Sequence, residues 1–73
     1  MYRITIGTII INTIGYDPVK QVLEVDFHLD GTYCYKDVPR KTFDNLMAAS
    51  SKSDYFRDQI DPNYNAEVGP CAE

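Results

Sequence analysis

The chain has 73 residues, of which 44% are hydrophobic, and this is enough for one domain with one small core. Seven Lys and Arg against 11 Asp and Glu give a net charge of -4, which disfavours general nucleic-acid binding because such binding depends on neutralising phosphates. No apolar run approaches the roughly 20 residues of a membrane-spanning helix, and Thr and Asn interrupt the first apolar run where a signal peptide would be continuous. We therefore expect a small acidic cytoplasmic protein without a membrane segment.

The first half of the chain predicts three β-strands. Residues 8–16 are rich in Ile and Thr, which favour strands because their side chains are branched at Cβ. Residues 22–29 alternate between apolar and polar, and an Asp-Gly pair then predicts a hairpin whose return strand covers residues 32–38. One face of the second strand carries an apolar row: Leu23, Val25, Phe27 and Leu29.

The second half predicts one or two helices and a tail. Ser53 is placed to cap a second short helix, in which Phe56 and Ile60 share a face. The first helix follows Pro39 and carries a stripe at helical spacing: Phe43, Leu46, Met47 and Ser50. We expect an α+β domain over residues 1–64, a three-stranded antiparallel meander followed by one or two C-terminal helices packed on one face. Residues 65–73 predict a loosely ordered acidic tail.

The length of the hairpin turn decides which face of the sheet two tyrosines occupy. A two-residue turn at the Asp-Gly pair places Tyr33 opposite His28 and Tyr35 opposite Asp26, on the face away from the apolar row. A four-residue turn preserves this assignment. A three-residue turn moves every residue of the return strand to the other face.

In the favoured register the tyrosines form an exposed platform for stacked bases, other flat ligands or a partner's side chains. A nearby basic cluster at the strand end and helix start favours an anion such as phosphate. The candidate ligand-binding residues are therefore Tyr33, Tyr35, His28, Lys36, Arg40 and Lys41. The alternative is that the tyrosines help to close the core while their hydroxyls reach water.

Catalysis and metal binding lack a supporting pattern. His28 has no third group to orient it as a general base, and Glu24 is simply on the polar side of an alternating strand. Cys34 and Cys71 form no C-x-x-C pattern, so we expect no zinc site, and in a reducing cytosol we expect them not to pair. The sequence predicts no enzyme activity, no cofactor and no metal.

Five short motifs follow one another along the chain: IGYD at 14–17, LEVDF at 23–27, YCY at 33–35, VP at 38–39 and SDYF at 53–56. Over about residues 8–64 this order resembles the KTSC domain, which is named after the C-terminal region of some lysyl-tRNA synthetases. The family consists mostly of single-domain proteins of bacteria and their phages. The resemblance implies RNA binding as one possible role, carries its Y-x-Y onto Tyr33 and Tyr35, and supplies no catalytic residues.

Two departures from the family pattern bear on function. An apolar stretch at residues 8–11 replaces a Ser-Ser-Asn-Ile-like segment, and this indicates extra burial or an oligomer contact. The tail is acidic where family tails are often basic, which weakens the RNA interpretation. We predict a small non-enzymatic binding module for nucleotides or single-stranded nucleic acid through the tyrosine platform. The alternative is a protein-interaction or homo-oligomeric module, for example a phage-type inhibitor of a host protein.

Overall fold

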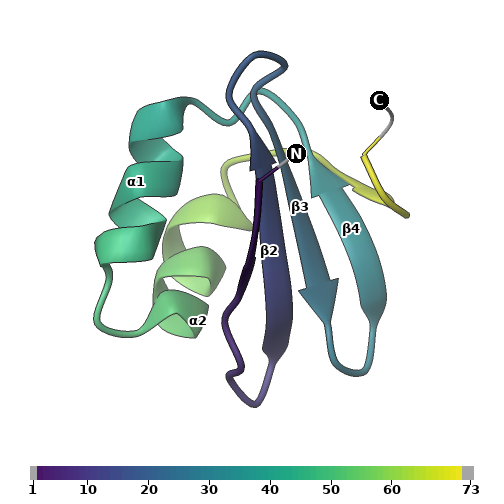
Figure 1. Cartoon of the computed structure of the whole chain (residues 1–73), viewed down its shortest axis with the longest axis vertical. Helices are drawn as coiled ribbons and strands as arrows, with labels where there is room; N and C mark the ends of the chain where they lie inside the picture. Colours follow the sequence, from purple (N-terminus) through teal and green to yellow (C-terminus); the bar gives the residue numbers. More distant parts are fainter. Residues whose placement is uncertain (1, 72–73) are drawn as a thin grey trace.

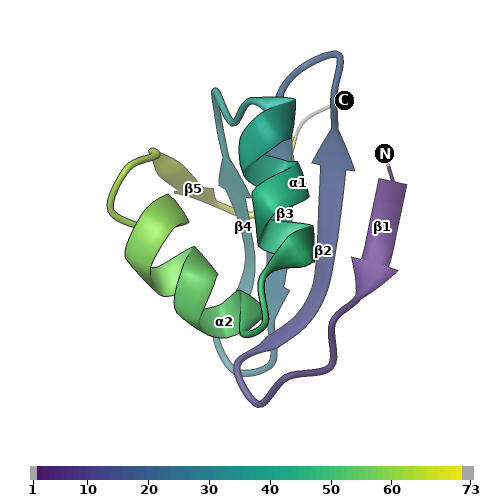
Figure 2. The ribbon, with the colours of Figure 1, turned by 90° about the vertical axis from the view of Figure 1, so that its left-hand side faces the viewer.

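A computed structural model describes residues 2–71 as a five-stranded antiparallel sheet with helices on one face (Figures 1 and 2). The strands lie side by side in chain order: β1 (Tyr2–Thr5), β2 (Ile11–Asp17), β3 (Val22–Phe27), β4 (Gly31–Tyr35) and β5 (Ala66–Val68). The helical segments lie between the last two strands in the chain: α1 (Arg40–Ala48), α2 (Lys52–Tyr55) and η1 (Phe56–Ile60). Figure 1 shows them to one side of the sheet, and we call the opposite face, which these helices do not cover, the open face.

The α+β class is confirmed, but the sheet has five strands where the sequence predicts three. The predicted strands correspond to β2, β3 and β4. The sequence does not reveal β1 because it has only four residues, and Gly7, with a φ of 68°, lies in the loop that separates it from β2. β5 escapes prediction because its three side chains are all exposed, which leaves no alternating pattern.

α1 packs on the sheet through its predicted apolar stripe. Phe43 and Leu46 are buried and Met47 is half-buried, whereas Ser50 lies beyond the end of the helix. The ring of Phe43 stacks on that of Tyr16, with centroids 4.6 Å apart and planes inclined by 8°. The rest of the core comes from the sheet, the segment before α1, and η1: Ile11, Ile14, Leu23, Val25, Tyr35, Val38, Phe56 and Ile60.

The second helix begins two residues earlier than predicted. Ser51, not Ser53, is its N-cap, and the Ser51 hydroxyl accepts a hydrogen bond from the Asp54 N–H at 3.4 Å. Ser53 instead donates its hydroxyl hydrogen to Thr8 Oγ1 at 2.9 Å, which ties α2 to the loop before β2. Two side chains of η1 are buried, as predicted: Phe56 and Ile60.

The predicted loose tail is wrong for residues 65–71. β5 pairs with β4, and Cys71 is buried against the open face of the sheet. The last two residues of the predicted tail, 72 and 73, lie outside the described part of the chain. Every helix in residues 2–71 falls short of the length and apolar character that crossing a bilayer requires.

Candidate functional site

The hairpin between β3 and β4 has a three-residue turn at residues 28–30. Phe27 pairs with Gly31, and Gly31 takes a left-handed conformation with a φ of 83°, which a glycine adopts without steric cost. The glycine therefore belongs to the return strand and not to the turn. This odd turn length reverses the predicted register.

Both tyrosines of β4 consequently face the helices. Tyr33 lies opposite Val25 and Tyr35 lies opposite Leu23, so the tyrosines share the face of the buried aliphatic row. The predicted pairing with His28 and with the polar side of β3 is wrong. The exposed tyrosine platform does not exist in this fold.

The tyrosine rings are held by other aromatic rings. Tyr35 is 3% exposed, meets Phe56 edge-on with centroids 5.2 Å apart, and donates its hydroxyl hydrogen to the Asp61 carboxylate at 2.9 Å. Burial, together with Asp61, raises the pKa of Tyr35 well above its usual value. Tyr33 is half-buried and meets Phe27 edge-on at 5.6 Å. Because Tyr35 is buried, its ring has no accessible face on which a base could stack.

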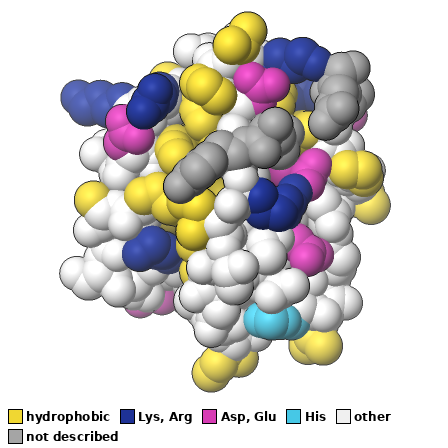
Figure 3. All heavy atoms as spheres, in the orientation of Figure 1, with side chains coloured by type: hydrophobic (Ala, Val, Ile, Leu, Met, Phe, Trp, Pro, Cys, Tyr) yellow, Lys and Arg dark blue, Asp and Glu magenta, His cyan; other side chains and the backbone are white. Residues whose placement is uncertain are grey.

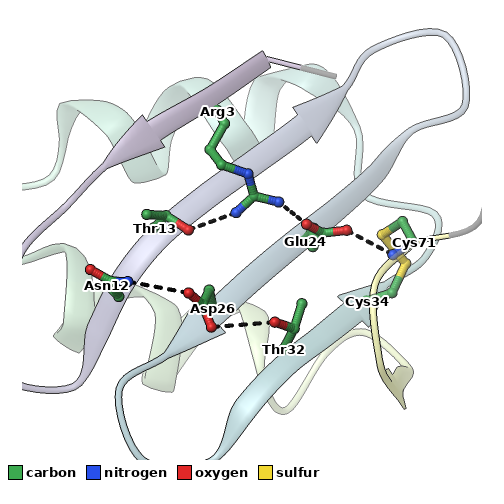
Figure 4. Close-up of polar contacts among 8 residues, drawn as sticks. All are labelled: Arg3, Asn12, Thr13, Glu24, Asp26, Thr32, Cys34 and Cys71. Atoms are coloured by element: carbon green, nitrogen blue, oxygen red, sulfur yellow. Dashed lines mark hydrogen bonds and ion pairs between the residues drawn. A yellow bond between two sulfur atoms is a disulfide. The ribbon is translucent and has the colours of Figure 1, made fainter.

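A polar network occupies the open face in place of the tyrosines (Figure 4). At its centre, the buried Glu24 carboxylate forms an ion pair with Arg3 and accepts a hydrogen bond from the backbone N–H of Cys71 at 2.8 Å. Arg3 also donates to Thr13 Oγ1 at 2.6 Å. The network thus joins β1, β2, β3 and the C-terminal segment, and its buried charge is paired, as burial of a charge requires.

The neighbouring carboxylate on β3 is also engaged. Asp26 accepts hydrogen bonds from Asn12 at 3.2 Å and from Thr32 at 3.3 Å, which links β2, β3 and β4 (Figure 4). Within residues 2–71, no three His, Cys, Asp or Glu side chains gather closely enough to hold a metal ion. The two carboxylates of β3 therefore have structural partners across the sheet.

Cys34 and Cys71 form a disulfide, so the expectation of two unpaired thiols is wrong. Their Cα atoms are 5.0 Å apart although 37 residues separate them in sequence. Cys34 alternates with the tyrosines and points to the open face, and Gly69, with a φ of 112°, lies in the segment that brings Cys71 back over that face. Because disulfides are rare in a reducing cytosol, the pairing weakens the argument for a cytoplasmic location, which stays a prediction.

The predicted basic cluster is divided among different acidic neighbours. Lys36 Nζ lies 2.7 Å from the Glu67 carboxylate of β5, and Arg40 Nε lies 3.7 Å from the Asp44 carboxylate one turn along α1. Lys41 is exposed. Two of the three positive charges are thus opposed by a carboxylate, and this reduces the field available to a phosphate.

A shallow hollow of about 380 Å³ lies between the start of α1 and the turn after β2, and it is lined by Tyr16, Pro18, Arg40 and Phe43. The two aromatic rings stack on each other, and the Tyr16 hydroxyl donates to the Val38 carbonyl at 2.5 Å. The rings are therefore fixed in the core, and Arg40 is the charged group that the hollow presents.

His28 fastens the turn after β3 to the loop before β2. Its backbone N–H donates to the Ile10 carbonyl at 3.1 Å, and its ring Nε2 donates to the Thr8 carbonyl at 2.8 Å. The Thr8 hydroxyl in turn accepts from the Ile11 N–H at 2.8 Å and from the Ser53 hydroxyl. His28 thus holds two turns and α2 in a fixed relation, and its Nε2 is engaged within the protein.

These two fastened turns expose aliphatic side chains. Ile9 and Leu29 are each 95% exposed, and Ile10 is 50% exposed beside the half-buried Phe27. Ile10 and Phe27 line two adjoining hollows of about 190 and 220 Å³. Figure 3 shows hydrophobic side chains on both sides of the single histidine at the lower end of the molecule. We call this surface the apolar end; it consists of Ile9, Ile10, Phe27 and Leu29.

Sequence reasoning missed the apolar end. The sequence alternation continues through residue 29, two residues past the end of β3, so Leu29 is wrongly assigned to the core row. Ile9 and Ile10 are wrongly assigned to the first strand, and only Ile11 of that stretch is fully buried. Of the two interpretations of this apolar stretch, extra burial therefore holds for one residue, and a contact with another molecule stays open for the others.

Comparison with known proteins gives consistent relatives. Residues 9–64 match the family model described as the KTSC domain. A protein of Tsukamurella paurometabola is 38% identical over 56 residues, covering 77% of this chain and 84% of that protein. An uncharacterized protein of Stutzerimonas stutzeri is 31% identical over 64 residues, covering 88% of this chain and 90% of that protein. The crystal structure of a KTSC domain protein from Yersinia pestis matches with a TM-score of 0.85 at 35% identity, covering 89% of this chain and 92% of that chain.

Proposed function

This chain belongs to the KTSC domain family, and we propose that it is a non-enzymatic module that binds a partner protein through the apolar end. The observation that carries the proposal is the near-complete exposure of Ile9 and Leu29 on two turns that are hydrogen-bonded to each other.

Burial of these side chains by a partner would be strongly favourable. Each aliphatic side chain that passes from full exposure to full burial contributes about 1.5–3 kcal/mol. Exposed apolar groups that lie together, next to a hollow, are typical of interaction sites, whereas scattered ones are not. Because His28 and Thr8 already fix both turns, binding would cost little additional ordering.

The charges around the apolar end favour a basic partner segment. Asp30 and Asp61 line its two hollows. The cation among the lining residues, Arg57, is itself paired with Asp54 at 2.9 Å and with Asp58 at 3.4 Å. A partner with an apolar side chain flanked by Lys or Arg would complement this rim, whereas a second copy would bring two acidic rims together.

Nucleotide or single-stranded RNA binding receives less support from the described residues. Tyr35 is buried, and Lys36 and Arg40 lie against carboxylates. What supports it is the position of Arg40 and Lys41 in the first turn of α1, where the helix dipole favours an anion. We therefore place a protein partner first.

The test uses affinity capture with matched variants. The double variant Ile9→Ser/Leu29→Ser removes two exposed aliphatic groups, and Val19→Ser removes one at the opposite end of the sheet, where Val19 is 90% exposed in the turn after β2. All variants should keep the thermal stability of the wild type because the replaced side chains contribute little to the core. We expect a partner captured by the wild type and by Val19→Ser, with an affinity lower by about 100-fold for the double variant, since about 3 kcal/mol is removed.

Capture by itself would not support the proposal, because the comparison between variants carries the information. A partner that binds the double variant and Val19→Ser equally well would show that the apolar end is not the binding surface. Binding that does not weaken as salt increases would contradict the basic character assigned to the partner.

A further inference from the structure

The edge of β4 is covered by the C-terminal segment, residues 65–71. β5 pairs antiparallel with β4, and all three of its side chains are exposed, Val68 to 82%. The segment thus buries little apolar surface of its own. A strand of three residues that buries so little is held only weakly by its hydrogen bonds.

Covalent attachment compensates for this weak packing. The Cys34–Cys71 disulfide joins the end of the segment to the middle of β4, and Glu24 holds the Cys71 N–H at 2.8 Å (Figure 4). The Lys36–Glu67 ion pair adds little because both groups are more than half exposed. The disulfide is therefore the main attachment of the segment to β4.

The edge of β4 that pairs with this segment carries regularly spaced backbone N–H and C=O groups. The Lys36 N–H donates to the Asn65 carbonyl at 3.2 Å, and the Gly69 N–H donates to the Thr32 carbonyl at 2.7 Å. Since backbone direction alternates along a strand, the N–H and C=O groups of residues 32, 34 and 36 point outward from the sheet. Without the segment, these groups would form an open edge, and open edges pair readily with other strands.

This edge is complementary to a second copy of itself. An antiparallel pairing of two β4 strands about a two-fold axis at Cys34 matches each outward-pointing residue with another. In that register Tyr33 lies opposite Tyr35 of the other copy, and Thr32 lies opposite Lys36. Aromatic pairs directly across strands are favourable, and no like charges oppose each other.

We propose that β4 is a latent dimerisation strand, covered by the C-terminal segment while the disulfide is intact and uncovered when a dithiol reduces it. The dithiol transfers two electrons to the Cys34–Cys71 bond, which breaks to give two thiols, and the reductant becomes its own disulfide. The freed segment leaves β4, and two copies pair edge to edge. This proposal is independent of the apolar end, which lies at another place on the molecule.

The test compares the whole chain with and without dithiothreitol, together with Cys71→Ser. Light scattering should show a monomer for the oxidised wild type and a doubling of molar mass for the reduced wild type and the variant. Hydrogen exchange distinguishes the states further: in the reduced dimer the Gly69 N–H loses protection, while the Lys36 N–H keeps it because the second copy replaces β5. In Cys71→Ser, mild oxidation should crosslink two chains through Cys34, since Cα atoms of such a pair lie about 5.5 Å apart.

A matched control is Cys34→Ser, which also lacks the disulfide. It should dimerise as Cys71→Ser does but should not crosslink at the strand centre. A reduced chain that stays monomeric, or in which Gly69 remains protected, would overturn the proposal. So would a reduced chain that is unfolded at every concentration, because paired β4 edges would make the melting temperature rise with concentration.

Discussion

Replacing Tyr16 by Phe should destabilise the protein more than removal of any half-exposed tyrosine hydroxyl. The Tyr16 side chain is 2% exposed, and its hydroxyl donates to the carbonyl of the fully buried Val38 at 2.5 Å. This bond joins β2 to the residue that precedes Pro39 and the start of α1. The ring would stay stacked on Phe43, so the substitution removes one hydrogen bond and leaves the aromatic packing in place.

The magnitude follows from the burial of the acceptor. A buried carbonyl that loses its donor costs about 1–3 kcal/mol. A chain of this length has a total stability of about 4–11 kcal/mol, so the loss is a large fraction of it. In thermal unfolding, about 4–8 °C of melting temperature corresponds to each kcal/mol in a domain of this size.

The assay is urea unfolding of the oxidised protein, with Tyr64→Phe as the matched control. The Tyr64 hydroxyl lies 3.1 Å from Thr42 Oγ1, and both residues are half-exposed, so each hydroxyl can turn to water when the other is removed. We expect a loss below about 1 kcal/mol for this control. Equal losses in Tyr16→Phe and Tyr64→Phe, or no loss in Tyr16→Phe, would refute the argument that burial of the acceptor sets the cost.

Three further predictions concern the disulfide, alkaline pH and nucleic acid. Reduction, or Cys71→Ser, should lower the unfolding free energy of the monomer by about 4 kcal/mol in urea titrations at concentrations too low for dimerisation, because the bond closes a loop across 37 residues. Burial raises the pKa of Tyr16 and of Tyr35, so the neutral phenols favour the folded state; their contribution to stability should be fully present below about pH 10 and be lost as pH rises above it, and the alkaline fall should be less steep in Tyr35→Phe. In fluorescence anisotropy at low salt, the wild type should bind single-stranded oligonucleotides no better than Arg40→Glu/Lys41→Glu, and a clear difference would restore the nucleic-acid interpretation.

Local periodicity in the sequence predicts the parts of the fold that depend on one element at a time. The spacing of Phe43 and Leu46 places both on the buried side of α1, and the alternation of Leu23 and Val25 places both in the core. These predictions are correct because the periodicity of a helix or strand depends only on residues within that element. They fix which face of an element is buried, but not which partner covers it.

Contacts between distant segments leave no comparable signal. The β5 residues are exposed, and the ladder that holds them uses backbone groups, which every sequence possesses. The pairing of Cys34 with Cys71 depends on the path of the chain over the open face. Two cysteines alone do not specify that path, and the sequence argument from compartment therefore gave the wrong answer.

The exposure of Leu29 at the apolar end was not predicted for a different reason: the turn between β3 and β4 has an odd number of residues, not an even number. Asp30-Gly31 fits both a two-residue turn made of these two residues and a three-residue turn that is followed by a left-handed glycine. The second choice leaves Leu29 in the turn, exposed to solvent, and places Tyr35 among the core side chains. A difference of one residue in turn length thus moves Leu29 from the interior to the surface and Tyr35 from the surface to the interior.

The same parity also determines the chemistry of the open face. Cys34 alternates with the tyrosines, so a turn that directed Tyr33 and Tyr35 to the open face would direct Cys34 toward the helices, out of reach of Cys71. The three-residue turn instead presents Cys34 on the face that the C-terminal segment crosses, beside Glu24. The exposure of Leu29 and the reach of Cys34 to Cys71 are therefore both consequences of one local conformation at Gly31.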